Sequence, residues 1–340
     1  MFGRFYIQYL YQETASWKKE GNLGDGIQNI AVENIYKKIG IQPQDLILIN
    51  RDDMPNYQGD NVELVMQSYF ANLYNTFPFP WSKDITPIFL GMHLSPIHNF
   101  RQLLIKRGIL KLMKPFEPIG CRDRNTRNFL KSHGINAYFS GCMSLTLDKR
   151  PTTPQNGKVF IVDLYSKALQ DLPKHIKDIA DYSITHIYQW KKDQKIDFES
   201  AMQFEQKARE ILNTYKEQAS LVITSRIHVA MPCIAMGIPV IFIAKNLFNA
   251  RYDVLQGIVP IYSYKDIKYI DWNPAPANID ILKEAILSNA IAQITKSDDR
   301  YRTIEKLNEI TSKLKPIGYL PWHRQFFRNL HTKLREIFHL

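Results

Sequence analysis

The chain has 340 residues, 45% of them hydrophobic and 23% charged, and this composition excludes a disordered or collagen-like protein. No apolar run approaches the roughly 20 residues that a bilayer-spanning helix needs, so we expect a soluble protein. Lys and Arg number 44 against 33 Asp and Glu, and the resulting net charge of +11 favours an anionic partner.

Short apolar runs alternate with helical patterns in the first half, which indicates βαβ units and a parallel sheet. A first helix is expected from Asp25 to Ile39, with Asp25 as its N-cap and Gly40 ending it. The expected strands are 5–10, 46–50, 62–66, 87–91, 118–121 and 137–139.

A polar stretch with two prolines and a glycine, residues 148–157, marks the expected domain boundary. A second series of strands follows at 159–162, 182–187, 221–224 and 240–244. We therefore predict an α/β protein with two Rossmann-like, doubly wound domains, residues 1–150 and 151–312, that face each other across a cleft. Open α/β sheets bind ligands at the carboxyl ends of their strands, so the site is expected in that cleft.

The C-terminal segment, residues 313–340, contains six basic residues and one acid, and residues 99–114 contain five basic residues and no acid. Taken as a helix, the C-terminal segment is amphipathic, with a basic stripe opposite aromatic and aliphatic residues. It either packs across a domain with a solvated basic face or contacts an anionic membrane surface, and both interpretations stay open. Nucleic acid is not expected, because the pattern of a recognised binding module is missing.

Three scattered cysteines, Cys121, Cys142 and Cys233, do not form a disulfide framework or a zinc site of the CxxC type. The N-terminal residues lack the long apolar region of a secretory leader. We expect a reducing, cytoplasmic location, peripheral to the membrane if the C-terminal segment touches it.

The most informative segment is 221–244, where a buried strand is followed by a small-residue helix that ends at Gly237. Ser225 has the chemistry of an N-cap, which places Arg226 and His228 in the first helical turn. The free N–H groups of that turn attract anions, and the Arg226 guanidinium suits a carboxylate or phosphate. The helix start favours neutral His228, so a protonated His228 would need the charge of a bound anion.

Glycines surround Asp25 in the stretch Gly21-Asn-Leu-Gly-Asp-Gly26, which allows a tight turn and the close approach of a ligand. A phosphate would compete with Asp25 for the helix terminus, so we interpret Asp25 as facing a sugar hydroxyl and acting as a base. A purely structural cap is the alternative.

Another strand ends at Arg122 and Asp123, with Asp123 as the expected cap and Arg122 as a second anion contact. A surface salt bridge is the competing interpretation. His93 and His186 also lie near expected strand ends, either as functional groups or as ordinary core histidines.

In this order, these motifs resemble the polysaccharide pyruvyl transferase family. The resemblance rests on Gly21-Asn-Leu-Gly-Asp25, Gly120-Cys-Arg-Asp123, Tyr138-Phe-Ser-Gly-Cys142 and Ser225-Arg-Ile-His228 running into Ala235-Met-Gly-Ile-Pro-Val240. It implies a fold similar to the GT-B glycosyltransferases and transfer of pyruvate from phosphoenolpyruvate to a sugar as a cyclic ketal.

Residue roles follow from the resemblance and from the residue chemistry together. The first domain would hold the acceptor, a sugar or lipid-linked oligosaccharide, and the second would hold the donor. His228 is expected as the acid and Asp25 as the base. Donor-binding residues are expected at Arg226, Ser225, Arg122 and Ile227, and acceptor-binding residues at Asn22, Gly24, His93 and Asp123. We expect no metal and no cofactor beyond phosphoenolpyruvate as co-substrate.

Two other functions remain possible on this pattern. A glycosyltransferase that uses a nucleotide sugar has the same use for an arginine at a helix terminus, because fold does not fix chemistry. A non-catalytic protein that binds a sugar or a lipid head group is the second alternative.

Overall fold

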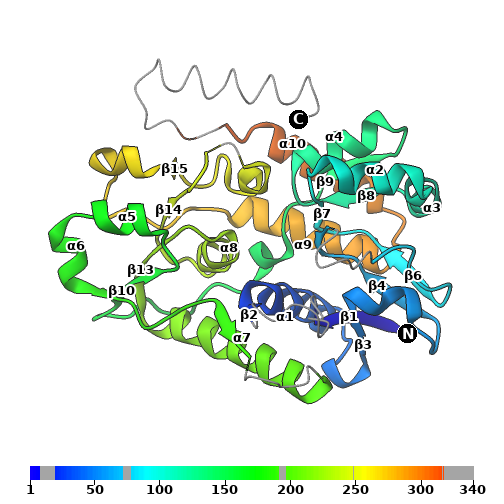
Figure 1. Cartoon of the computed structure of the whole chain (residues 1–340), viewed down its shortest axis with the longest axis horizontal. Coiled ribbons are helices and arrows are strands. Elements are labelled where there is room, and N and C mark those ends of the chain that lie inside the picture. Colours follow the sequence, from blue (N-terminus) through cyan, green and yellow to red (C-terminus); the bar gives the residue numbers. More distant parts are fainter. Residues whose placement is uncertain (8–19, 72–77, 191–196, 248, 316, 318–340) are drawn as a thin grey trace.

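Parallel strands form the framework of both halves of the chain (Figure 1). The computed structural model describes residues 1–7, 20–71, 78–190, 197–247, 249–315 and 317. Its helices are α1 (Leu23–Lys38), α2 (His98–Lys106), α3 (Ile109–Met113), α4 (Arg124–Ser132), α5 (Ser166–Asp171), α6 (Lys174–Ile179), α7 (Phe198–Gln218), α8 (Ile227–Ala235), α9 (Asp280–Ile294) and α10 (Arg300–Ser312).

The first half contains two four-stranded parallel sheets that run into each other. Their orders are β3-β1-β4-β6 and β5-β7-β8-β9. A backbone hydrogen bond from Gly120 N of the second sheet to the carbonyl of Phe89, which follows the last strand of the first, connects the two. The strands are β1 (Phe2–Ile7), β3 (Ile47–Asn50), β4 (Val62–Val65), β5 (Ser68–Phe70), β6 (Ile85–Ile88), β7 (Met92–Leu94), β8 (Ile119–Cys121) and β9 (Ala137–Phe139).

The second half contains a five-stranded parallel sheet with the order β11-β10-β13-β14-β15. The strand order turns back beside β10, as it does beside β1, and such switch points are where doubly wound sheets bind ligands. The strands are β10 (Lys158–Val162), β11 (Ala180–Asp181), β13 (Ala219–Thr224), β14 (Val240–Ile243) and β15 (Ile261–Tyr262). The predicted α/β class with parallel sheets is confirmed.

Elements of the two halves pack directly against each other. Strand β2 (Glu20–Asn22) pairs antiparallel with β12 (Ile187–Gln189). Helix α1 lies between α7 and α8 (Figure 1), and one continuous apolar cluster contains Ile27 of α1, Ala208 of α7 and Val229 of α8. The start of α1 is thereby fixed beside the start of α8.

Several predicted boundaries were wrong. The first strand is Phe2–Ile7 rather than 5–10, whose last residues lie outside the described ones. Helix α1 begins at Leu23, because the side chain of Asn22 caps it by accepting from Gly24 N. Residues 182–187 are not one strand, because the Asp163 carboxylate binds Thr185 and the backbone N–H of His186 and holds them in a loop.

The predicted polar boundary, 148–157, is a loop between η4 (Met143–Thr146) and β10. The division into two domains across a cleft stays a prediction. Most of the predicted basic segment 313–340 lies outside the described residues. Among the described helices, none combines the length and apolar character that crossing a membrane requires.

Candidate functional site

The turn from β13 into α8 forms one wall of a pocket. The helix begins at Ile227, and Arg226 occupies the N-cap position without a side-chain capping bond. Ser225 is not the cap that the sequence suggested, because its hydroxyl donates to the carbonyl of Ile243 at 2.7 Å. The first turn therefore keeps backbone N–H groups without intrahelical acceptors, as an anion site requires.

The pocket at this turn has a volume of about 110 Å³, which suits a small ligand. Its walls come from both halves of the chain, because Asn22 precedes α1 whereas the other lining residues lie beyond β13. The lining residues are Asn22, Ser225, Arg226, Ile227, His228, Asn249, Arg251 and Tyr252.

Behind the pocket wall, the buried guanidinium of Arg122 contacts His228. Its Nη1 lies 3.2 Å from His228 Nε2 and donates to Gln28 Oε1 at 2.8 Å. Arginine can only donate, so Nε2 of His228 accepts and the ring proton of the neutral imidazole sits on Nδ1. The Nε and Nη2 atoms of Arg122 are fully buried and find no partner among the described residues. A buried charge with unsatisfied donors is costly, so this side chain is poised for an anion.

His228 is neutral in this arrangement. Burial lowers the pKa of His228 well below its usual value, and the positive charges of Arg122 and Arg251 lower it further. The prediction of a neutral imidazole at the helix start is confirmed in its direction.

Asp25 lies in the first turn of α1, buried next to the same group. Its Oδ1 accepts from Gln28 Nε2 at 3.2 Å, whereas Oδ2 is buried without a partner among the described residues. Burial raises the pKa of Asp25 to about 6, although Arg51, Arg251 and other arginines oppose the rise. This carboxyl group therefore exchanges its proton near neutral pH.

The two helix starts approach so closely that only glycine fits between them. A Cβ atom at Gly24 would stand 2.6 Å from Cβ of His228. Asn22 caps α1 through its Oδ1 atom, and the same atom lies 3.5 Å from Arg226 Nη1. The predicted Gly24 and Asn22 are thus part of this site.

Arg226 is held by a carboxylate at the switch point of the second sheet. Its Nε lies 2.6 Å from Oδ2 of Asp163, the residue that follows β10. Asp163 has a φ of 47°, a left-handed conformation that aspartate tolerates better than most residues. The Arg226 side chain keeps 32% of its surface exposed, so it can still meet a ligand.

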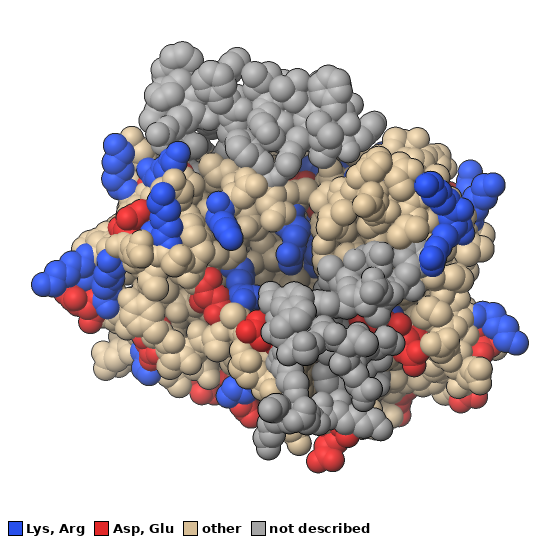
Figure 2. Space-filling view, in the orientation of Figure 1, with Lys and Arg blue, Asp and Glu red and all other residues tan. Residues whose placement is uncertain are grey.

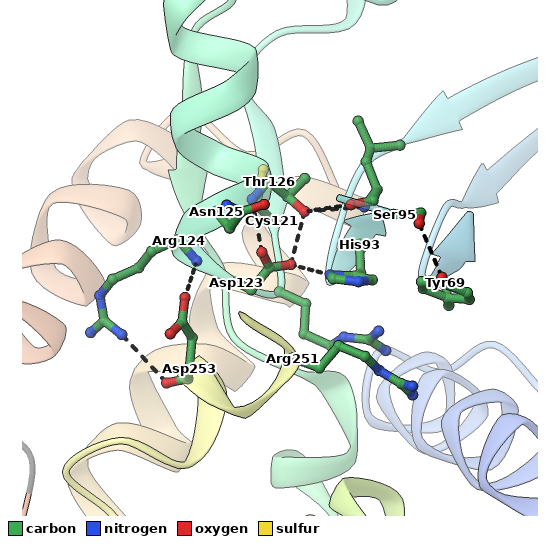
Figure 3. Close-up of polar contacts among 12 residues, drawn as sticks. Tyr69, His93, Ser95, Cys121, Asp123, Arg124, Asn125, Thr126, Arg251 and Asp253 are labelled. Carbon is green, nitrogen blue, oxygen red and sulfur yellow. Dashed lines mark hydrogen bonds and ion pairs between the residues drawn. The ribbon is translucent and has the colours of Figure 1, made fainter. Parts of the chain in front are cut away.

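A second polar group, shown in Figure 3, lies at the end of β7 and β8. His93 Nδ1 is 2.5 Å from Asp123 Oδ2, and Asp123 caps α4 by accepting from Thr126 N. Both side chains are buried, and His93 Nε2 has no partner among the described residues. The predicted cap at Asp123 is confirmed, and the surface salt bridge considered for this motif is excluded by its burial.

Arg251 connects the two groups, and the sequence analysis missed it. It belongs to η5 (Ala250–Leu255), lines the pocket and places its Cζ 5.3 Å from the centre of the Tyr69 ring, which stacks on His93. Figure 3 shows it between η5 and the His93–Asp123 pair. The only sequence signal is an Asn249 cap soon after a strand, a pattern too common to single out an arginine.

The structure brings the predicted residues together in two neighbouring groups. His228 lines the pocket, Arg122, Asp25 and Gly24 are packed around it, and His93 and Asp123 form the second group. His186 is a core histidine outside both, bonded to the Tyr215 hydroxyl. Within the described residues, no three or more His, Cys, Asp and Glu side chains are arranged to hold a metal ion.

Parallel sheets whose strand order turns back, together with two arginines that line a pocket at a helix start, define this molecule as an α/β protein with a basic pocket. The family model described as polysaccharide pyruvyl transferase matches residues 22–246, which include both groups of the site. The chain belongs to the polysaccharide pyruvyl transferase family.

Similarity outside the family match is limited. No curated protein matches the chain. The chain is similar to one solved structure of a protein of uncharacterised function from Klebsiella pneumoniae, with 16% sequence identity and a TM-score of 0.42. The match covers 74% of this chain and 87% of the Klebsiella chain.

Proposed function

We propose that this protein transfers pyruvate from phosphoenolpyruvate to two hydroxyl groups of a sugar, forming a cyclic ketal and releasing phosphate. The observation that carries the proposal is the buried Arg122, whose Nε and Nη2 lack partners among the described residues beside His228. Membership of the family supports transfer to a polysaccharide or its precursor.

The pocket matches the charge and size of this donor. Phosphoenolpyruvate carries a carboxylate and a phosphate, which two planar guanidinium groups and a helix start can bind. Arg226 and Arg251 line the pocket and Arg122 lies behind it. A volume of about 110 Å³ favours a small donor over a nucleotide sugar.

His228 supplies the proton for the donor. A bound dianion offsets the positive charges of Arg122 and Arg251, and the pKa of His228 then rises from the low value of the empty site. The imidazolium gives its proton to the methylene carbon of phosphoenolpyruvate while a sugar oxygen bonds to the central carbon. The neutral imidazole that remains later takes up the proton that the second attacking hydroxyl releases, which restores the imidazolium.

Asp25 and the His93–Asp123 pair serve the acceptor. The Asp25 carboxylate takes the proton of the first attacking hydroxyl, and a pKa near 6 suits a base at neutral pH. The C–O bond to phosphate then breaks and phosphate leaves. The second hydroxyl bonds to the same carbon and gives up its proton. Two new C–O bonds have then replaced the C–O bond to phosphate and the π bond of the double bond. The free Nε2 of His93 is suited to orient a sugar hydroxyl.

Phosphate release tests the proposal. The purified chain is incubated with phosphoenolpyruvate and free or lipid-linked oligosaccharides, and phosphate and the mass of the acceptor are measured. We expect phosphate and a pyruvylated acceptor in equal amounts. Consumption of a nucleotide sugar with release of nucleotide, and none of phosphoenolpyruvate, would contradict the proposal.

Arg122→Gln is the sharpest variant for this assay. Loss of the guanidinium removes a charged contact that the anion needs, and kcat/KM should fall on the order of 10²-fold or more. Arg122→Lys keeps the charge without the fork and should recover only part of the loss. Arg127→Gln, on the half-buried face of α4, is the matched control and should retain activity.

A further inference from the structure

Helices α2 and α3 present a surface that is basic and apolar at once. Three large aliphatic side chains are exposed there, Ile97 by 56%, Ile105 by 37% and Leu112 by 46%. Exposed lysines lie beside them in the sequence. We define the α2–α3 surface as Ile97, Ile105, Lys106, Lys111, Leu112 and Lys114.

The inner faces of the same helices are fully used by the core. Phe100 and Leu104 of α2 and Ile109 and Met113 of α3 are buried in the apolar cluster of the first half. Gly108, with a φ of 69°, makes the turn between the helices. The aliphatic residues of the α2–α3 surface therefore cannot be explained as part of this core.

The lysines of the α2–α3 surface also differ from others in the chain. Lys38, Lys158 and Lys207 each pair with a carboxylate. Among the described residues, no carboxylate pairs with Lys106, Lys111 or Lys114. Residues 99–114 contain no acidic residue, and no described carboxylate from another part of the chain forms an ion pair with these lysines. Figure 2 shows basic side chains gathered over this part of the molecule, without acidic ones among them.

We propose that the α2–α3 surface docks the protein onto a membrane that contains anionic lipids. Exposed aliphatic side chains next to lysines fit the boundary between acyl chains and head groups, where the lysines meet lipid phosphates. A nucleic acid offers the phosphates without the apolar layer that Ile97, Ile105 and Leu112 need. Isolated aliphatic side chains are common on surfaces, but here three of them are exposed on two consecutive short helices that also carry unpaired lysines, which favours an amphipathic surface.

Docking at this surface would bring the membrane to the acceptor group of the site. Helix α2 follows β7, which carries His93, and buried Arg101 of α2 donates to the carbonyl of Ser95 beyond that strand. The surface and His93 are therefore rigidly connected. This consequence rests on the proposed function, and it favours an acceptor anchored to a lipid.

Vesicle binding of the full chain tests the proposal. Vesicles of phosphatidylcholine alone and with phosphatidylglycerol are sedimented with the protein, and the bound fraction is measured. We expect binding to the anionic vesicles, reduced at least tenfold in Lys106→Glu/Lys111→Glu/Lys114→Glu. The matched control Lys167→Glu/Lys265→Glu/Lys268→Glu makes the same charge change beside Tyr264 and Tyr269 and should retain binding.

A second variant tests the apolar part. Ile105→Ser/Leu112→Ser leaves the charge unchanged and should also weaken binding to anionic vesicles, with a loss that persists at high salt. Equal losses in the lysine variant and its control would overturn the proposal, because net charge alone would then explain binding. Undiminished binding in both α2–α3 variants would overturn it as well, as would strong binding of the wild type to neutral vesicles or a preference for nucleic acid.

Two further measurements separate this proposal from the proposed function. Melting temperatures establish that the variants fold, and phosphate release from phosphoenolpyruvate with a soluble acceptor should stay unchanged in them. Vesicle binding needs no turnover, so its loss in the variants supports docking even if no pyruvyl transfer is found. Turnover without vesicle binding would overturn docking alone.

Discussion

Arg122 shows at the scale of one residue what a buried and incompletely paired charge costs this fold. A guanidinium without exposed surface has lost its hydration, and two of its nitrogens receive nothing in return among the described residues. Removing a charged group from water costs several kcal/mol unless a partner replaces the water. An anion bound at the guanidinium would recover this cost, and the proposed function therefore assigns Arg122 to the donor.

Asp25 gives a prediction about pH at the same scale. Burial raises its pKa from 3.8 to about 6. As pH rises, the Asp25 carboxyl therefore loses its proton at a lower pH in the unfolded chain than in the folded protein. The Asp25 carboxyl therefore lowers the stability of the wild type between pH 4 and 7, by about 3 kcal/mol at most, and Asp25→Asn lacks this contribution. Urea unfolding across this range should show the difference between variant and wild type growing with pH. A difference that stays constant would refute the raised pKa.

Arg251 leads to a second prediction about a single residue. Its guanidinium lines the pocket and helps keep His228 neutral. Arg251→Ala should raise the KM for phosphoenolpyruvate about tenfold and raise the pKa of His228, which moves the alkaline limb of the pH profile upward because His228 acts as the acid. Arg300→Ala removes an arginine that also lies over a tyrosine ring and should change neither quantity.

At the scale of elements, the site depends on the close approach of α1 and α8. Gly24→Ala would force Cβ against the Cβ of His228, 2.6 Å away. We expect kcat to fall more than tenfold. The free energy of unfolding should change by no more than about 3 kcal/mol, because alanine favours the helix and offsets part of the strain. Gly26→Ala is the control, since its Cβ would meet Ala208 of α7 rather than His228. Equal activity of the two variants would show that this contact does not position the imidazole.

Local pattern was enough to predict some elements and not others. The buried run from Leu221 and the small-residue helix after it predicted β13 and α8, because burial on both faces and helix-ending Gly237 are encoded locally. The predicted cap at Ser225 was wrong, because its hydroxyl donates to the carbonyl of Ile243, a residue of the next strand that no local pattern takes into account. The cap of α1 was predicted at Asp25 and lies at Asn22, because either side chain can cap a helix and the pattern alone favoured the later residue.

The candidate site was predicted unevenly for the same reason. His228 and Arg226 stand in one local motif at a strand end, so sequence alone pointed to them. Arg251 lies in a turn that contacts the first half of the chain, where Asp253 accepts a hydrogen bond from the backbone N–H of Arg124. That contact joins the two halves of the chain, and no local pattern encodes it.

At the scale of the whole molecule, a buried ion network ties the two halves together. Arg4 of β1 pairs with Glu33 of α1 and with Glu205 of α7, and Arg209 of α7 pairs with both glutamates. The side chains of Arg4 and Glu205 are at most 5% exposed. The alternation of strands and helices predicted the doubly wound sheets, but pairing across the halves depends on residues far apart in the sequence.

Glu205→Gln tests whether this network holds α1, and with it Asp25, against the second half. The substitution leaves the buried Arg4 charge with only Glu33 to neutralise it, so unfolding free energy should fall by about 3 kcal/mol. Glu210→Gln on the same helix removes a half-exposed partner of Lys207 and should cost less than about 1 kcal/mol. Urea unfolding measures both. Equal costs would mean that the network contributes no more than a surface pair, and α1 would then depend on apolar packing alone to stay beside α8.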